Sequence, residues 1–142
     1  MNPEPRYVFD NNAVVSAALF SESVPAQALY AALEHGTLMI SAATLTELRD
    51  VLARKKFDRY LTRDERDEFL AMLVEEGEVV EIVEEIDACR DRKDNKFLDV
   101  AVNGAASCLV SGDQDLLVLH PFRGIPILAP AQFLAGLPHD TT

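Results

Sequence analysis

The stretch Tyr7-Val-Phe-Asp-Asn-Asn-Ala-Val-Val15 ends a short apolar run on an acidic residue, Asp10, and continues in residues that favour a helix. Later in the chain, Cys108-Leu-Val-Ser-Gly-Asp113 repeats this arrangement of an apolar run followed by an acid. Open α/β sheets build their sites beyond the carboxyl ends of their strands. Because both acids follow predicted buried strands, we expect Asp10 and Asp113 to meet at one edge of a sheet.

Short apolar strands alternate with amphipathic helices along the chain. Strands are predicted at residues 7–9, 37–40, 78–83, 108–110 and 125–128, with 78–83 at a sheet edge. Helices are predicted from about residue 13 to 20, 26 to 34, 44 to 54, 62 to 77 and 94 to 106. This alternation indicates an α/β fold, in which a central parallel sheet of about four to five strands is flanked by helices on both faces.

Length and composition are typical of one globular domain, with 142 residues, 49% apolar and 26% charged. We expect residues 1–142 to form a single domain, with a core over about residues 6–137 and short flexible termini. No apolar run is long enough to span a membrane, and Met1 to Arg6 lacks a signal-peptide pattern, which predicts a cytoplasmic protein. Cys89 and Cys108 form no CxxC pair, which argues against a disulfide scaffold or a zinc site.

Glu47, Asn95 and Asp99 lie between the two strand-end acids, on segments that read as helices. Together with Asp10 and Asp113 they could bring four acids and an amide to one end of the sheet. A dense carboxylate cluster requires a cation, and oxygen ligands without His or Cys suit Mg²⁺ or Mn²⁺. The pattern therefore points to divalent metal chemistry.

Structural alternatives exist for the first two acids. Asp10 could cap the helix that follows it, because Asp is a favoured N-cap residue. Thr44-Leu-Thr-Glu47 fits a capping box, in which Glu47 would only return a hydrogen bond to the cap.

The later polar residues have alternatives of the same kind. Asn95, Asp99 and Asn103 recur at four-residue spacing, which is also the pattern of a solvated helix face. Asp94 lies at the predicted helix start and fits a cap better than a metal ligand. Asp113 and Asp115 fit a turn. Only the combination of all these residues favours a metal site.

The net charge of −11 argues at first sight against a nucleic-acid partner, because phosphate binding depends on Lys and Arg. Most basic residues nevertheless fall into two groups: Arg49, Arg54, Lys55, Lys56, Arg59, Arg63 and Arg66, and then Arg90, Arg92, Lys93 and Lys96. Charge alone leaves open whether these groups bind RNA or are solvated helix faces.

Four stretches of the chain share their order and spacing with a known family. They are Val8-Phe-Asp-Asn-Asn-Ala-Val-Val-Ser16, Ser41-Ala-Ala-Thr-Leu-Thr-Glu-Leu-Arg-Asp-Val-Leu52, Cys89-Arg-Asp-Arg-Lys-Asp-Asn-Lys-Phe-Leu-Asp99 and Leu109-Val-Ser-Gly-Asp-Gln-Asp-Leu-Leu117. Over residues 7 to about 137 the chain resembles the PIN-domain family, in particular the toxins of toxin-antitoxin pairs.

The resemblance implies a set of site residues. Asp10, Glu47 and Asp113 correspond to family metal ligands, and Asn12 to a residue that helps to hold the site. Asn95 stands where many members carry their third acid, and Asp99 is the carboxylate one helical turn later, so either could touch the metal. The expected catalytic residues are Asp10, Glu47, Asp99 and Asp113, with Asn12, Asn95, Asp94 and Asp115 in support.

The function implied by the resemblance is that of a Mg²⁺- or Mn²⁺-dependent endoribonuclease, the toxin of a type II toxin-antitoxin pair. Its partners would be an RNA substrate, a cognate antitoxin protein and further copies of itself in a homodimer or higher homo-oligomer. RNA contacts are expected from the basic residues nearest the site, Arg49, Arg54, Lys55, Lys56, Arg92, Lys93 and Lys96. The alternative is a catalytically weak or inactive PIN-like module that binds RNA or protein, in which Asn95 weakens metal binding.

Overall fold

The computed structural model of the chain describes residues 4–137. Five strands form one sheet in the order β3-β2-β1-β4-β5, and all four neighbouring pairs are parallel. The strands are β1 (Arg6–Phe9), β2 (Thr37–Ile40), β3 (Glu78–Val79), β4 (Cys108–Val110) and β5 (Ile127–Leu128). The predicted parallel sheet is therefore confirmed, whereas the predicted flexibility of residues 1–3 and 138–142 lies outside the described residues.

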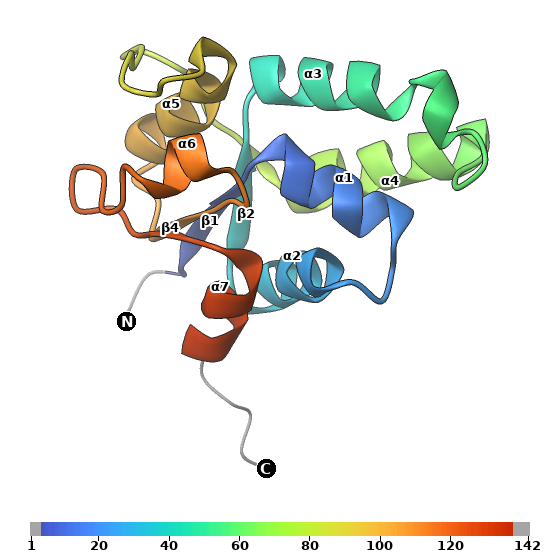
Figure 1. Ribbon diagram of the computed structural model, residues 1–142, viewed down its shortest axis with the longest axis horizontal. Coiled ribbons are helices and arrows are strands. Elements are labelled where there is room, and N and C mark those ends of the chain that lie inside the picture. The colour runs from blue at the N-terminus through green and yellow to red at the C-terminus, as the bar shows by residue number, and fades with distance from the viewer. Residues whose placement is uncertain (1–3, 138–142) are drawn as a thin grey trace.

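Helices cover both faces of this sheet (Figure 1). They are α1 (Asn11–Leu19), α2 (Val24–His35), α3 (Ala42–Leu52), α4 (Arg63–Glu76), α5 (Asn95–Asn103), α6 (Gln114–Leu117) and α7 (Pro130–Gly136), with 3-10 turns η1 (Lys55–Phe57) and η2 (Arg92–Asp94). No helix in residues 4–137 is long and apolar enough to cross a membrane.

Alternating side chains of the buried strands define two hydrophobic cores. Tyr7 and Phe9 of β1 pack with α1, α2, α3, α4 and α7, whereas Val8 packs on the opposite face with α5 and α6. Burial on both faces explains why the central strands β1, β2 and β4 are mostly apolar, whereas both residues of the edge strand β3 are exposed.

The register of β1 against β4 positions the first site residues. Phe9 pairs with Val110, and the backbone N–H of Asp10 donates to the carbonyl of Val110 at 3.0 Å. Asp10 and Ser111 consequently follow neighbouring strands at the same carboxyl edge of the sheet. The meeting of the two strand ends that the sequence predicts is confirmed.

The predicted edge strand 78–83 is shorter in the structure, because β3 ends at Val79. The chain then leaves the sheet and is held by polar side chains of α5. Asn103 Oδ1 accepts from the N–H groups of Val83 and Glu84, both at 3.0 Å, and Asp99 Oδ1 accepts from Ile86 at 2.6 Å. Asn95 Oδ1 accepts from Ala88 at 3.2 Å and from Cys89 at 2.8 Å. The three polar residues that recur at four-residue spacing on α5 thus anchor a loop and do not form a freely solvated face.

Candidate active site

Asp10 is the most deeply buried acid of the site, with 2% of its surface exposed. One carboxylate oxygen, Oδ1, accepts from the N–H of Ala13 at 2.9 Å and so caps α1. The other, Oδ2, accepts a 2.5 Å hydrogen bond from Ser111 Oγ. Burial raises the pKa of Asp10, while the hydrogen bonds from Ser111 and Ala13 act in the opposite direction. Asp10 therefore serves both as a cap and as a buried acid of the site.

Ser111 links Asp10 to the acids that follow β4. Its side chain is fully buried, and its Oγ accepts from the N–H of Asp113 at 2.9 Å. Asp113 in turn caps α6, since its Oδ1 accepts from the N–H of Asp115 at 2.9 Å. These bonds fix the acids at the ends of β1 and β4 relative to one another.

A polar pocket of about 270 Å³ lies beside these strand ends. Its lining comes from α1, α3, the segment around η2 and the start of α6. The lining residues are Asn12, Glu47, Val51, Arg54, Asp91, Lys93, Asp94 and Asp113. The pocket thus brings together six residues that the sequence analysis singles out for the site or for RNA contacts: Asn12, Glu47, Arg54, Lys93, Asp94 and Asp113.

Asp94 does not act as the cap that its sequence position suggests. It occupies the N-cap position of α5, but its side chain makes no capping hydrogen bond. Its Oδ2 is buried and accepts no hydrogen bond from any part of the chain that the structure describes. Burial, followed by the neighbouring carboxyl of Asp113, raises the pKa of Asp94 to about 7. An acid in this environment is a functional-site candidate.

Asp94 also belongs to a second acidic group with Asp91 and Asp115. One carboxylate oxygen from each of these three half-buried residues lies within 4.8 Å of the other two. The atoms that these residues offer to a cation are all oxygens, as are those of Glu47 and Asp113, which also line the pocket. The unpartnered Asp94 oxygen and this donor set fit a hard divalent cation such as Mg²⁺ or Mn²⁺.

Glu47 is not part of the capping box that its sequence context suggests. The helix begins two residues earlier than predicted, so Ser41 and Thr44 form the box. Glu47 instead faces the pocket, where Oε1 accepts from Asn11 Nδ2 at 3.0 Å and Oε2 forms an ion pair with Lys96. Asn11 is itself buried and also donates to the carbonyl of Thr44 at 3.1 Å, which fixes its amide.

Asn95 and Asp99 lie outside the residues that line the pocket. As described above, their side-chain oxygens accept backbone hydrogen bonds from the segment before η2. Asp94, the last residue of η2, lines the pocket, and Lys96 in the first turn of α5 forms the ion pair with Glu47.

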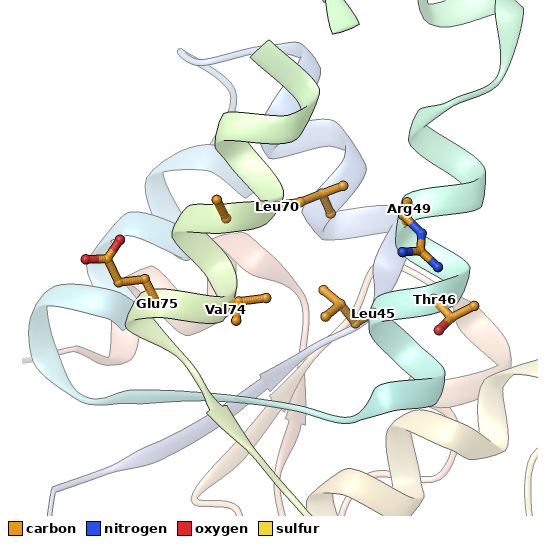
Figure 2. Close-up of a pocket in the computed structure, with 7 residues that line it drawn as sticks. Leu45, Thr46, Arg49, Leu70, Val74 and Glu75 are labelled. Carbon is orange, nitrogen blue, oxygen red and sulfur yellow. The ribbon is translucent and has the colours of Figure 1, made fainter. Parts of the chain in front are cut away.

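The predicted RNA-contacting residues are divided among several surfaces. Arg54 and Lys93 line the polar pocket described above, which we call the acidic pocket. Lys55 and Lys56 lie in η1, and Arg92 lies in η2. Arg49 instead lines a separate, mainly apolar groove of about 420 Å³ between α3 and α4. Figure 2 shows Leu45 of α3 pointing across this groove toward Leu70 and Val74 of α4. Arg49 is therefore not grouped with the residues of the acidic pocket.

Three residues of the arrangement were not singled out from the sequence: Ser111, Asn11 and Asp91. The signal for Ser111 is its position directly after β4, which matches that of Asp10 after β1. Asn11 and Asp91 give no comparable local signal, because their partners lie on other elements.

Comparisons with known proteins identify the family and the fold of this chain. Residues 6–115 match the PIN domain, so the chain belongs to the PIN domain family. No curated protein sequence matches the chain.

Two solved structures share its fold. One is the structure of VapBC2 from Rickettsia felis bound to a DNA fragment from its promoter. It has a TM-score of 0.59 and 14% sequence identity, and the match covers 86% of this chain and 96% of that one. The other is PAE2754 from Pyrobaculum aerophilum, with a TM-score of 0.60 and 16% sequence identity. That match covers 93% of this chain and 88% of the other. At these identities the likeness concerns the fold alone.

Proposed function

We propose that this PIN domain is a metal-dependent endoribonuclease and the toxin of a toxin-antitoxin pair. The observation that carries the proposal is the convergence of three acids, Glu47, Asp94 and Asp113, on one polar pocket at the carboxyl edge of the sheet. The buried carboxylate of Asp10 is joined to Asp113 through Ser111. Membership of the PIN domain family supports a nuclease activity.

Asp10, Asp94 and Asp113 are the acids that we propose to hold a Mg²⁺ or Mn²⁺ ion. Asp94 is favoured over Asn95 and Asp99 as the third acid because it lines the pocket and its Oδ2 accepts no hydrogen bond from the described residues. Asn95 and Asp99 lie outside the lining and hold the loop before η2 instead. A bound ion of this type would lower the pKa of a water and offset negative charge on a phosphodiester.

The surrounding residues prepare this site. Ser111 orients the buried carboxylate of Asp10, and Asn11 orients that of Glu47. Lys96 compensates the charge of Glu47, so the pocket can hold several carboxylates at moderate cost. Arg54 and Lys93 lie on the pocket lining, where they would bind phosphates on either side of the scissile bond.

The toxin assignment is supported by the fold shared with VapBC2, whose structure is described as bound to promoter DNA. It predicts an antitoxin protein that binds this chain and stops cleavage. Co-expression with the product of the neighbouring reading frame, followed by a cleavage assay on the purified pair, tests that part of the proposal.

The nuclease itself is tested by incubating purified protein with a mixed RNA substrate and increasing Mn²⁺, beside Asp10→Asn. We expect cleavage that depends on metal and is lost in the variant. RNA binding that is indifferent to metal, without cleavage by the parent, would instead favour the binding module.

A further inference from the structure

Two aromatic rings form an exposed pair at the far end of α1. Phe20 directly follows α1, and Tyr60 lies in the segment after η1. Their ring centroids are 5.3 Å apart in an edge-to-face arrangement, yet Phe20 is 48% exposed and Tyr60 43% exposed. Single exposed aromatics are common, whereas two in contact on the surface suggest a binding site.

The surroundings of this pair are basic, although the whole chain is acidic. Residues 54–60 supply four exposed cations, Arg54, Lys55, Lys56 and Arg59. The one acid among these seven residues, Asp58, forms an ion pair with Arg66 at 2.6 Å. Opposite them, the short segment between α1 and α2 contributes Glu22. The formal charge of residues 54–60 together with this segment is therefore positive.

One of these cations lies directly at the aromatic pair. The guanidinium of Arg59 lies 5.3 Å from the ring centroid of Tyr60, within the range of a cation–π contact. Lys56 Nζ makes a similar contact with the neighbouring ring of Phe57, at 5.0 Å. Aromatic rings combined with Lys and Arg are the elements with which proteins bind single-stranded nucleic acid.

The pair is connected to the acidic pocket along two elements. Val51 and Arg54, at the end of α3, line the pocket, and the chain continues from them through η1 to Tyr60. Asp10 and Phe20 flank α1 at its two ends, and the nine-residue helix between them is about 14 Å long at 1.5 Å per residue. Figure 1 shows α1 and α3 extending toward the same side of the molecule. Phe20 is therefore separated from Asp10 by about the length of α1.

We propose that Phe20 and Tyr60, with Arg59, form a stacking site for an unpaired base of the RNA substrate. This inference rests on the proposed nuclease function and extends it to substrate binding. A base offers a flat π-face to the rings, and its flanking phosphates match the four cations of residues 54–60. RNA fits these residues better than an apolar protein surface, which would bury the cations without neutralising them.

The test measures binding of a short, fluorescently labelled single-stranded RNA in an Asp10→Asn background, in which the RNA stays intact. Phe20→Leu and Tyr60→Leu keep an apolar side chain but remove the ring. We expect each to weaken binding by about fivefold or more, the change that corresponds to the lower end of a base–aromatic stack. The salt dependence should stay unchanged, because no phosphate contact is lost.

Two further variants serve as controls. Tyr60→Phe retains the ring and should bind like the parent. Tyr30→Ala removes an equally exposed aromatic, 47% exposed on α2, and should also bind like the parent. The parent should bind an RNA with abasic positions as weakly as the leucine variants bind the intact RNA. The affinity of the leucine variants should differ little between the intact and the abasic RNA.

Equal RNA affinity of the parent and both leucine variants would overturn the stacking site, while cleavage by the unmodified protein would leave the nuclease proposal intact. Leucine variants that change the sedimentation mass but not RNA affinity would assign the rings to a protein contact and would also overturn it. A parent that neither binds nor cleaves RNA would remove both proposals together.

Discussion

Ser111 Oγ and Asp10 Oδ2 form a 2.5 Å hydrogen bond between residues that are 101 positions apart in the sequence. The bond joins the carboxyl ends of β1 and β4, and Ser111 also accepts from the N–H of Asp113. A single buried hydroxyl thus sets the relative positions of two of the proposed metal ligands.

Ser111→Ala should weaken Mn²⁺ binding by about tenfold or more, the usual effect of losing a residue that orients a metal ligand. The hydroxyl favours the ionised form of Asp10, so its loss should cost more affinity at pH 6 than at pH 8. Calorimetric titration at both pH values measures this. Ser21→Ala, at an exposed serine outside the site, is the control. Unchanged affinity at both pH values would exclude a role for Ser111 in positioning Asp10.

Asp10→Asn should abolish cleavage and stabilise the metal-free protein at pH 7. Burial raises the folded pKa of Asp10 above 3.8, so the folded state holds this proton more tightly than the unfolded state. The resulting stability is present at low pH and is lost as pH rises through the folded pKa. The variant should therefore unfold at a higher temperature than the parent at pH 7, with a smaller difference near pH 4. Thermal unfolding with a chelator measures this, and a less stable variant at pH 7 would contradict it.

Asp94 should make the stability of the metal-free protein depend on pH in a second way. Its folded pKa is about 7 and its ordinary value is 3.8, so its contribution to stability should decline as pH rises between about 4 and 7. Asp94→Asn should flatten the stability profile in this window and should also abolish cleavage. Urea unfolding across the window, with exposed Asp50→Asn as the control, provides the measurement. A profile as steep as that of the parent would show that Asp94 does not titrate in this window.

Asp99 should contribute to stability more than to catalysis, because its Oδ1 holds the N–H of Ile86. Asp99→Ala removes this acceptor and should lower the free energy of unfolding by about 1–3 kcal/mol. Asp99→Asn keeps an acceptor and should retain both stability and metal-dependent cleavage. If Asp99→Asn instead lost as much cleavage as Asp94→Asn, Asp99 would be restored as the third metal ligand.

Replacing Lys55, Lys56 and Lys93 together by Gln should weaken RNA binding and reduce its salt dependence. Three phosphate contacts contribute about two to the slope of the logarithm of the binding constant against the logarithm of the salt concentration, at roughly 0.7 per contact with a single strand. Anisotropy titrations between low and physiological salt measure the slope. Its persistence in the triple variant would place the RNA on another face of the molecule.

The order of the five strands and five longer helices, and the strand-end acids, could be predicted from the sequence, because both depend on local patterns. The short helices α6 and α7 were not predicted. Short buried strands with caps or turns at their ends identify β1, β2 and β4 and the positions of Asp10 and Asp113. Thr62 likewise marks the start of α4 through its capping box with Glu65. The edge strand was overestimated, since hydrogen bonds from α5 draw the chain away after Val79.

The tertiary structure alone decides which polar residues share the pocket. Asp94 and Asn95 are adjacent in sequence, yet Asp94 lies against Asp113 while Asn95 holds the loop before η2, because successive residues point in different directions at the start of a helix. The contacts of Ser111 with Asp10, of Lys96 with Glu47 and of Phe20 with Tyr60 also join segments distant in the chain. No periodicity or local motif encodes such pairs, since they arise only when helices and strands pack against one another.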